Sequence, residues 1–498
     1  MRFRSPRSLD PVFRPAAPPA RAKLGALGVA LAVGVTTAVR PSLGLLAASG
    51  GLLLVVLTLK PDRAALAAIA LLYSNAAVLA VTVHRLPPYA VAIVPLLLAL
   101  PLIHVFGIRR ERMRITPAMP WLVGYLIVLI VATVLSIDRA TAFSNLMIFF
   151  GEGLCLYVAV VNIVRTERLL REIVWLLLIV GATLALISTH QTVTAAYADS
   201  YLGFSQNSEV HTQAYRSDIT GETLPPRSGG PLGKANRYAQ ILVVLLPLGL
   251  LRTRDEPTRR LRITAGALTA MITVGVTLTY SRGAAVALGI TLLVMTAMGY
   301  ARGRQLVLVV VVVTSLLALF PRYVQRLSTI AAVEGLIDED AGAPRADGAI
   351  RGRVTSMLGS LFVYADHPIV GVGPGLYPLY HEDKALEIGL RVLDHRQPHS
   401  LIPHIAAESG TLGLICFGAI VFLTLRDANR ARRRWAGDWP QLASLVASLQ
   451  LAVVAYLSTG LFLHLAYERY YWLILALTGA ASSIVRPVPL ARPRPEQP

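Results

Sequence analysis

The sequence predicts an all-α fold, a polytopic membrane bundle of about fourteen transmembrane helices. Of the 498 residues, 55% are hydrophobic and only 15% are charged, and the mean hydropathy is +0.59. A water-soluble chain of this length rarely carries so much apolar sequence. The apolar residues also fall in runs of about 16 to 24, the length that a helix needs to cross a hydrocarbon core of ~30 Å.

The predicted spans divide the chain into seven segments. The spans begin near Leu24, Ser42, Ala64, Pro88, Met119, Ala142, Glu172, Tyr238, Ile263, Ala284, Gln305, Gly410, Leu442 and Tyr471. Weak spans set the range at about 12 to 14. The segments are a cytoplasmic basic tail (1–23), helices one to seven (24–189), an outer loop (190–237), helices eight to eleven (238–320), a large outer catalytic loop (321–409), helices twelve to fourteen (410–486) and a cytoplasmic tail (487–498).

The distribution of Lys and Arg predicts which ends of the spans face the cytoplasm, because cytoplasmic loops hold the excess of basic residues. With both termini inside, the inner segments, among them 165–171 and 252–262, hold 30 of the 47 basic residues. The short outer loops hold five in all, and the remaining 12 lie in the two long outer segments, where the rule barely applies. The sequence therefore predicts that both long loops, with any chemistry that they carry, lie on the non-cytoplasmic side.

Composition also excludes some classes of function. The net charge of +19 does not indicate a nucleic-acid partner, because the Lys and Arg residues lie in short clusters between apolar runs. The two cysteines, Cys155 and Cys416, both fall inside apolar segments. They therefore offer neither a disulfide framework nor a thiolate metal site.

The large outer loop holds five of the ten histidines and predicts one amphipathic helix. Apolar residues recur at helical spacing from Ile350 to Phe362, and such a helix would lie on the bundle or at the lipid interface. Asp366-His367-Pro368 should end it, because the residue before a proline disfavours the helical conformation.

Two arginine segments are candidates for binding an anion. Tyr280-Ser281-Arg282-Gly283 places a guanidinium at the predicted outer end of span nine, where it suits a bidentate grip on phosphate oxygens. An interfacial arginine that extends to the lipid headgroups is the commoner explanation. Arg351 and Arg353 open the amphipathic helix, where the helix dipole does not favour cations. A solvated charge pair is again the commoner explanation.

A glycine-rich segment and a histidine segment follow. The segment from His367 to Gly375 could form only a turn, or its Gly373 and Gly375 could bring backbone N–H groups close to a diphosphate. His399 would lie at the water-facing mouth of the bundle, where an imidazole can take a proton from a sugar hydroxyl near neutral pH.

A metal site in the histidine segment is disfavoured. Its ligands would be His395, His399, His404 and Glu408. Their spacings do not place all four on one helical face, and Pro403 interrupts the turn. No metal or other cofactor is therefore expected.

In this order and spacing, the segments resemble the O-antigen ligase and polymerase superfamily of bacterial membrane glycan transferases. These proteins share a multi-helix bundle and a large late outer loop that ends in a His-Asn…Glu-x-Gly-x-x-Gly segment. The matching stretches are Gly230–Ala239, Tyr280–Gly283, Arg353 with the helix that leads into His367–Gly375, and His399–Gly413. Ser400 stands where the family usually has the asparagine, and Gly-Lys-Ala precedes Asn236 where the family often has Asn-Pro.

The resemblance implies an enzyme of the bacterial cytoplasmic (inner) membrane whose active site faces the periplasm. Its donor would be a glycan on undecaprenyl diphosphate or a similar polyprenyl lipid, and its acceptor a glycan, a lipid A core or a protein, in the biosynthesis of lipopolysaccharide or another surface polysaccharide. His399 would bind or deprotonate the acceptor hydroxyl, and Arg282 would stabilise the departing diphosphate. The residues implied in binding the donor are Arg353, Arg351, Lys234, Asn236, Gly373, Gly375 and Glu408.

Other functions remain open at this stage. The donor chemistry is common to a polymerase and a ligase, so the motifs do not separate them. A metal-dependent lipid-phosphosugar transferase would need an acidic pair in the first outer loop, which here is only about Arg40-Pro41. A flippase or transporter should carry ionisable groups deep within its spans, and Glu152 and His104 are the main candidates, although an interhelical carboxyl with a partner is the simpler account.

Overall fold

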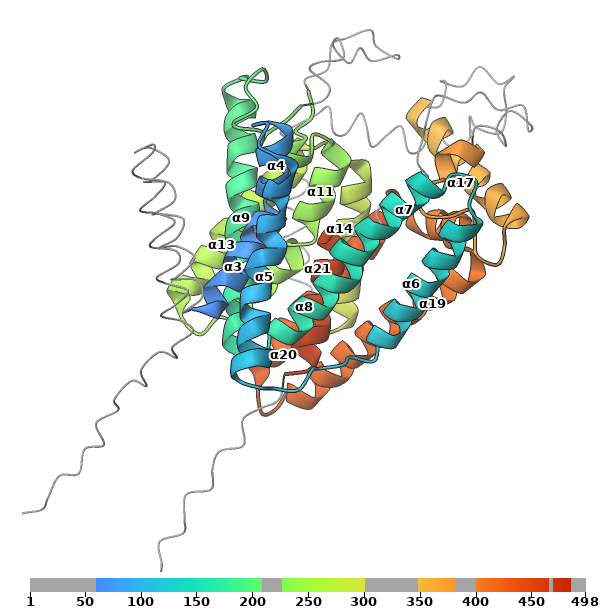
Figure 1. Cartoon of the computed structure of the whole chain (residues 1–498). Coiled ribbons are helices and arrows are strands. Elements are labelled where there is room, and N and C mark those ends of the chain that lie inside the picture. Colours follow the sequence, from blue (N-terminus) through green and yellow to red (C-terminus); the bar gives the residue numbers. More distant parts are fainter. Residues whose placement is uncertain (1–59, 208–225, 301–347, 382–399, 465–468, 485–498) are drawn as a thin grey trace, which may run out of the picture. The chain divides into compact units, whose positions relative to one another are not determined.

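In the computed structural model of the chain, the described residues are 60–207, 226–300, 348–381, 400–464 and 469–484 (Figure 1). The predicted spans at Leu24, Ser42 and Gln305 lie outside them. The chain forms two compact units, residues 1–64 and 65–498, and only residues 60–64 of the first are described. Throughout the described ranges the secondary structure is helical, with no strand, which confirms the predicted all-α class.

Each predicted span that begins within these ranges coincides with a helix or with helices in series. From residue 60 to 207 the helices are α3 (Pro61–Tyr73), α4 (Ala76–Thr82), η1 (Pro88–Ala92), α5 (Ile93–Ile103), η2 (His104–Ile108), α6 (Met119–Leu135), α7 (Arg139–Ile148), η3 (Phe149–Cys155), α8 (Leu156–Ile163) and α9 (Glu167–Val193). Further along are η4 (Gly230–Leu232), α11 (Ala235–Val243), α12 (Leu246–Asp255), α13 (Arg259–Leu278), α14 (Arg282–Ala297), α17 (Gly348–Asp366), α19 (Leu401–Trp435), α20 (Pro440–Gly460) and α21 (Arg469–Ser482).

The lengths and composition of these helices are those of an integral membrane protein. Among the described residues, six continuous helical runs are long and apolar enough to cross a membrane, and the bent pair α3 and α4 makes a seventh candidate. Helices α6 and α14 are apolar but shorter. The total of about fourteen spans and the cytoplasmic placement of both termini stay predictions.

Glycines bring the central helices into close contact. A Cβ atom on Gly181 of α9 would lie 2.2 Å from Leu245, and one on Gly275 of α13 would lie 2.6 Å from Ala185. A Cβ atom on Gly249 of α12 would similarly lie 2.1 Å from the hydroxyl oxygen of Thr269. Small residues at such contacts let helix backbones approach closely, which is how membrane helices gain packing energy in the absence of a hydrophobic driving force.

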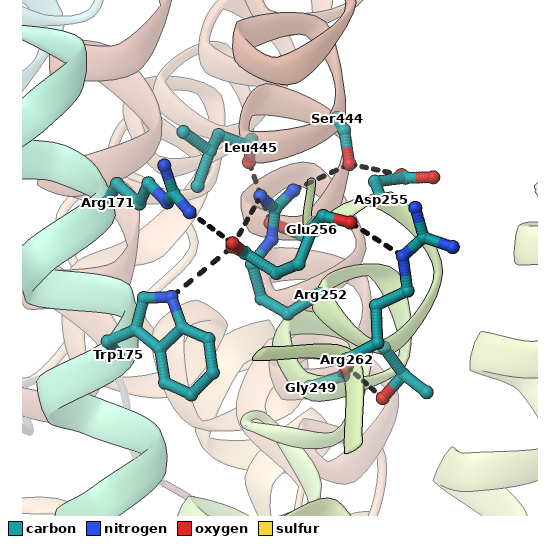
Figure 2. A network of polar contacts seen from close by, with 11 residues as sticks. Arg171, Trp175, Gly249, Arg252, Asp255, Glu256, Arg262, Ser444 and Leu445 are labelled. Atoms are coloured by element: carbon teal, nitrogen blue, oxygen red, sulfur yellow. Dashed lines mark hydrogen bonds and ion pairs between the residues drawn. The ribbon is translucent and has the colours of Figure 1, made fainter. Parts of the chain in front are cut away.

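A buried ionic network, here called the clamp, joins one end of these helices (Figure 2). The Glu256 carboxylate is fully buried and accepts hydrogen bonds from Arg171, from Trp175 Nε1 at 3.3 Å and from Arg252 Nη1 at 3.4 Å. Arg252 also donates to the Ser444 hydroxyl at 2.6 Å. The clamp thus ties the start of α9 and the start of α20 to the end of α12, and it gathers the basic segments 165–171 and 252–262 at one end of the bundle.

The predicted amphipathic helix is present as α17, and it ends at Asp366 as expected. Its apolar residues Met357, Leu358, Leu361 and Phe362 are 41–47% exposed. The buried side chains are small, namely Ser356, Ser360 and Val363, and a Cβ atom on Gly359 would lie 2.4 Å from His381. The helix therefore packs through its small residues, and its apolar row faces outward, as at a lipid interface.

Candidate functional site

Two of the predicted segments meet at the end of the bundle opposite the clamp, here called the site end. Arg227 Nε donates to the carbonyl of Thr279 at 2.8 Å, and its Nη2 donates to Asn236 Oδ1 at 2.8 Å. The Ser281 hydroxyl accepts from the N–H of Ala284 at 3.4 Å, and this cap places Arg282 at the first position of α14. Arg227 therefore ties the start of α11 to the turn before α14.

The helix ends at the site end are tightly packed. Asn236 and Gln240 of α11, Ser281 and Gly283 at the start of α14, and Thr459 of α20 line a cavity of only about 10 Å³. This is room for about one water molecule. Gln240 Nε2 donates to the Thr459 hydroxyl at 2.6 Å across it. A large anion at this end would contact the exposed ends of the helices rather than enter between them.

The glycine-rich segment and α19 contact each other through their backbones. Helix α19 is broken at Gly410, whose φ of 62° and ψ of −165° are not helical. The carbonyls of residues 407 and 408 accept hydrogen bonds from the N–H groups of Val372 and Gly373, both at 3.0 Å. The N–H of Thr411 donates to the carbonyl of Pro368 at 2.8 Å. The loop thus satisfies backbone groups that the break would otherwise leave unpaired.

Glycine is required at these positions because the backbones nearly touch. A Cβ atom on Gly371 would lie 2.3 Å from the Glu408 carbonyl carbon, and one on Gly410 would lie 2.3 Å from the Ile369 oxygen. A Cβ atom on Gly375 would lie 2.2 Å from the amide nitrogen of Asn145 on α7. The glycines, including Gly373, therefore build the loop, and their contact with a diphosphate stays a prediction.

A buried histidine and glutamate lie in the first turns of α19. His404 Nε2 is 3.1 Å from Glu408 Oε1, and their side chains are 5% and 0% exposed. Residues four apart share a helix face, so the local helix alone creates this pair. The pair thus places an imidazole beside a carboxyl group that is excluded from solvent.

His464, after the end of α20, connects the two halves of the site. Its Nε2 is 3.3 Å from Arg237 Nη2 of α11, and its ring contacts the ring of His404 edge to face at 5.7 Å. The end of α20 also packs against the start of α19, since a Cβ atom on Gly460 would lie 3.1 Å from Leu401. Sequence reasoning assigned no role to Arg227, Arg237 or His464. The predicted topology offered one signal for His464, because it placed this histidine at the outer end of span thirteen.

The other predicted site residues lie at or directly before the starts of helices. Lys234 immediately precedes α11, and Arg351 and Arg353 lie in the first turns of α17, where their side chains are outside the described set. His399 is also outside it, and the next described residue is Ser400, directly before α19. The described helices thus bring Lys234, Asn236 and Arg282 to one end, and His464 connects this end to the start of α19.

The site end is rich in positive charge. Arg237 lies on α11, Lys234 directly precedes it and Arg282 begins α14, while Arg227 joins these two elements from the segment before η4. Guanidinium groups suit diphosphate oxygens because their donors form a rigid fork. Among the described residues, no group of three or more His, Cys, Asp or Glu residues is arranged to hold a metal ion.

The fold defines a polytopic helical membrane protein, and arginines and histidines gather in a candidate site at its helix ends. Residues 267–418 of this protein match the O-antigen ligase family, so the predicted resemblance is confirmed. The match runs from α13 to the middle of α19 and includes Arg282, the glycine-rich segment and Glu408. It supports a glycosyltransferase-type function in O-antigen processing. No curated protein matches the chain.

Proposed function

We propose that this protein transfers a glycan from a polyprenyl-diphosphate lipid to an acceptor hydroxyl on the outer face of the cytoplasmic membrane, as an O-antigen ligase or polymerase. The observation that carries the proposal is the meeting of the segments at one end. Arg227 ties Asn236 to the turn before Arg282, and His464 links Arg237 to His404. The stretch Gly230–Ala239 lies before the region that matches the O-antigen ligase family, and the other segments lie within it.

The arginines would act on the donor. Arg282 at the start of α14 would hold the diphosphate and stabilise the negative charge that develops as it leaves the sugar. Arg353, Arg351 and Lys234 would share this role from neighbouring elements, and Arg227 is close enough to α14 to assist. A diphosphate that arginines neutralise is a good leaving group, so the proposed reaction needs no metal ion.

His399 would act on the acceptor. In the sequence it stands five residues before His404 and directly before Ser400, the residue that caps α19. Its imidazole would take the proton of the acceptor hydroxyl as the oxygen attacks the anomeric carbon, and this displacement inverts the configuration. The pair His404–Glu408, with His464, would fix the start of α19 and so position His399.

A transfer assay tests the role of His399. Purified protein in nanodiscs receives a lipid-linked glycan and an acceptor, with excess EDTA. We expect His399→Ala to lower the rate by at least about 100-fold, the usual contribution of general base catalysis. The matched control is His395→Ala, a histidine of the same segment, which should keep its activity. Full activity in His399→Ala, or loss of wild-type activity in EDTA, would overturn the mechanism.

The charge and the geometry of Arg282 can be separated. Arg282→Lys keeps the positive charge but loses the rigid fork of donors, so we expect an intermediate rate. Arg282→Ala should lower kcat by about 100-fold or more, the range for removing one electrostatic contact to a developing charge. Steady-state kinetics with varied donor would measure both. Equal rates for the alanine variant and the wild type would exclude Arg282 from the reaction.

The products separate the two kinds of transferase. A ladder of glycans of increasing length indicates a polymerase, whereas transfer of one finished chain indicates a ligase. A flippase would move the donor without forming a glycosidic bond. The deep carboxyl that favoured this alternative, Glu152, pairs with Arg469 at 3.0 Å, so it has a structural partner.

A further inference from the structure

A second cavity, of about 380 Å³, lies among the helices before α9 and beside the start of α21. Its size is within the range of small-molecule sites. Its wall is almost entirely hydrocarbon, contributed by α3, α4, α5 and α8 through residues such as Leu72, Val78, Leu98, Leu102 and Leu156. Helix α5 lines the cavity on one side and is exposed on the other, where Leu96 and Ile103 are 63% and 60% exposed. The cavity is therefore one helix away from the surrounding lipid.

One end of the cavity is polar but charge-balanced. Arg469, the first residue of α21, lies 3.0 Å from Glu152 and also donates to the Asn75 side-chain oxygen. Glu152 is brought into the cavity by η3, a stretch of π-helix within the span from Arg139 to Ile163. Because the charges cancel, this end does not attract a phosphate group. The cavity suits the apolar part of a ligand rather than an anionic headgroup.

The polar end also borders the proposed active site. Asn75 Nδ2 donates to the carbonyl of Pro231 at 2.9 Å, and Gln206 donates to the same oxygen at 3.4 Å. Pro231 belongs to η4, which leads through Lys234 to Asn236 at the start of α11. A lipid whose diphosphate bound beside α11 would thus begin its hydrocarbon chain close to the mouth of the cavity.

We infer that this cavity binds the polyprenyl chain of the donor lipid. The inference rests on the proposed function and adds a second site to it. Large apolar cavities do not hold water, and within a bilayer the available apolar ligands are hydrocarbon chains. The balanced pair Arg469–Glu152 lines the end of the cavity that Asn75 links to η4. This link places the chain of the donor, rather than that of a bulk phospholipid, beside the headgroup site.

Cys155 reports on the cavity without any substitution. It lines the cavity and is exposed, whereas Cys416, the other cysteine of the chain, is buried elsewhere. Wild-type protein in phosphatidylcholine nanodiscs is treated with N-ethylmaleimide, and modification of each cysteine is followed by mass spectrometry. Polyprenyl phosphate at about ten times its dissociation constant should slow the labelling of Cys155 about tenfold and leave Cys416 unchanged. An equal mole fraction of phosphatidylglycerol should have no effect.

A cavity-filling variant tests the connection to transfer. Ala99→Trp places an indole in the cavity from α5, and Leu293→Trp, at a 67% exposed position of α14, is the matched control. We expect Ala99→Trp alone to raise the KM for the donor about tenfold with kcat unchanged, since it would remove binding shared by ground and transition states.

The possible failures are distinguishable. If polyprenyl phosphate does not protect Cys155, or if phosphatidylglycerol protects it equally, the inferred chain site is wrong even when the wild type transfers glycan. If Cys155 is protected but the wild type forms no glycosidic bond, the proposed transferase function fails and the lipid site stands. An unchanged KM in a folded Ala99→Trp protein would also overturn the inferred site.

Discussion

At the scale of single residues, the contact between Arg237 and His464 determines which ring nitrogen of a neutral His464 carries its proton. A guanidinium is always charged, so Arg237 donates and His464 Nε2 must accept, which leaves the proton of a neutral His464 on Nδ1. His404 Nε2 lies 3.1 Å from Glu408 Oε1, so these two buried side chains contact each other in the first turns of α19. These fixed rings hold the start of α19, directly after His399. Substitutions of Glu408 should therefore act on the reaction through the position of His399.

Tyr377 offers a test of a buried polar contact near α17. Its hydroxyl donates to the carbonyl of Ser356 at 2.7 Å and lies 2.9 Å from His381 Nδ1. Tyr377→Phe would remove both contacts of this buried hydroxyl, so we expect it to lower the free energy of unfolding by about 0.5–1.5 kcal/mol. Chemical denaturation in detergent would measure this. Tyr364→Phe, which removes an exposed contact to Thr411, is the control and should cost less.

The contribution of Tyr377 should depend on pH. Burial raises the pKa of its phenol above the ordinary value, so the folded protein holds this proton more tightly than the unfolded chain does. The stabilisation is then complete below the ordinary pKa of about 10 and is lost as the pH rises beyond it. The difference in unfolding free energy between wild type and Tyr377→Phe should be constant from neutral pH to about pH 9 and shrink above pH 10. A difference that shrinks on acidification would contradict this account.

At the scale of the element, the break in α19 is what gives the site its shape. Gly410 has a positive φ with ψ near 180°, a conformation that is essentially restricted to glycine. Gly410→Ala should therefore lower the unfolding free energy by at least about 1–3 kcal/mol and reduce transfer, because its Cβ would strike the Ile369 oxygen. Thermal unfolding in detergent and the transfer assay would show both effects.

Gly418, two turns further along the same helix, is the control for Gly410. A Cβ atom there would meet nothing within 4 Å. Gly418→Ala should be neutral, or stabilising by about 0.5–1 kcal/mol, because alanine loses less conformational freedom in a helix. Equal effects of the two substitutions would mean that the break is not required for the fold.

Hydropathy and local chemistry predicted the spans well because both depend on neighbouring residues. The end of α17 before Pro368 and the beginning of a new helical segment at Gly410 followed from the same local rules. The π-helical stretch η3 could not be predicted, because a span with a π-bulge has the same apolar residues as a regular one. The outward orientation of the apolar row on α17 depends on what its small residues Ser356 and Ser360 touch, which the sequence does not contain.

At the scale of the molecule, the bundle separates a stabilising end from a cationic site end. The charge distribution predicted that segments 165–171 and 252–262 share one side, and the clamp places them together. The charge distribution gave no indication that Glu256 would be fully buried, since a carboxylate in a basic loop is normally solvated. The burial arises because α9, α12 and α20 meet around this side chain. His464 was missed for the same reason, because its partners Arg237 and His404 are distant in the sequence.

The clamp should control stability without controlling the reaction. Glu256→Ala would leave Arg252, whose side chain is 2% exposed, as a buried charge without its carboxylate partner. We expect the free energy of unfolding to fall by about 3–5 kcal/mol, the usual effect of breaking a buried pair. The double variant Arg252→Leu with Glu256→Leu should recover much of this loss, because it removes the buried arginine together with the buried carboxylate. Arg168→Ala, which removes an exposed pair with Glu172 on α9, should cost only about 0.3–0.5 kcal/mol.

Because the clamp lies at the end opposite Arg282, the KM for the donor should be unchanged in the folded fraction of all these variants. A raised KM would show that the two ends are coupled.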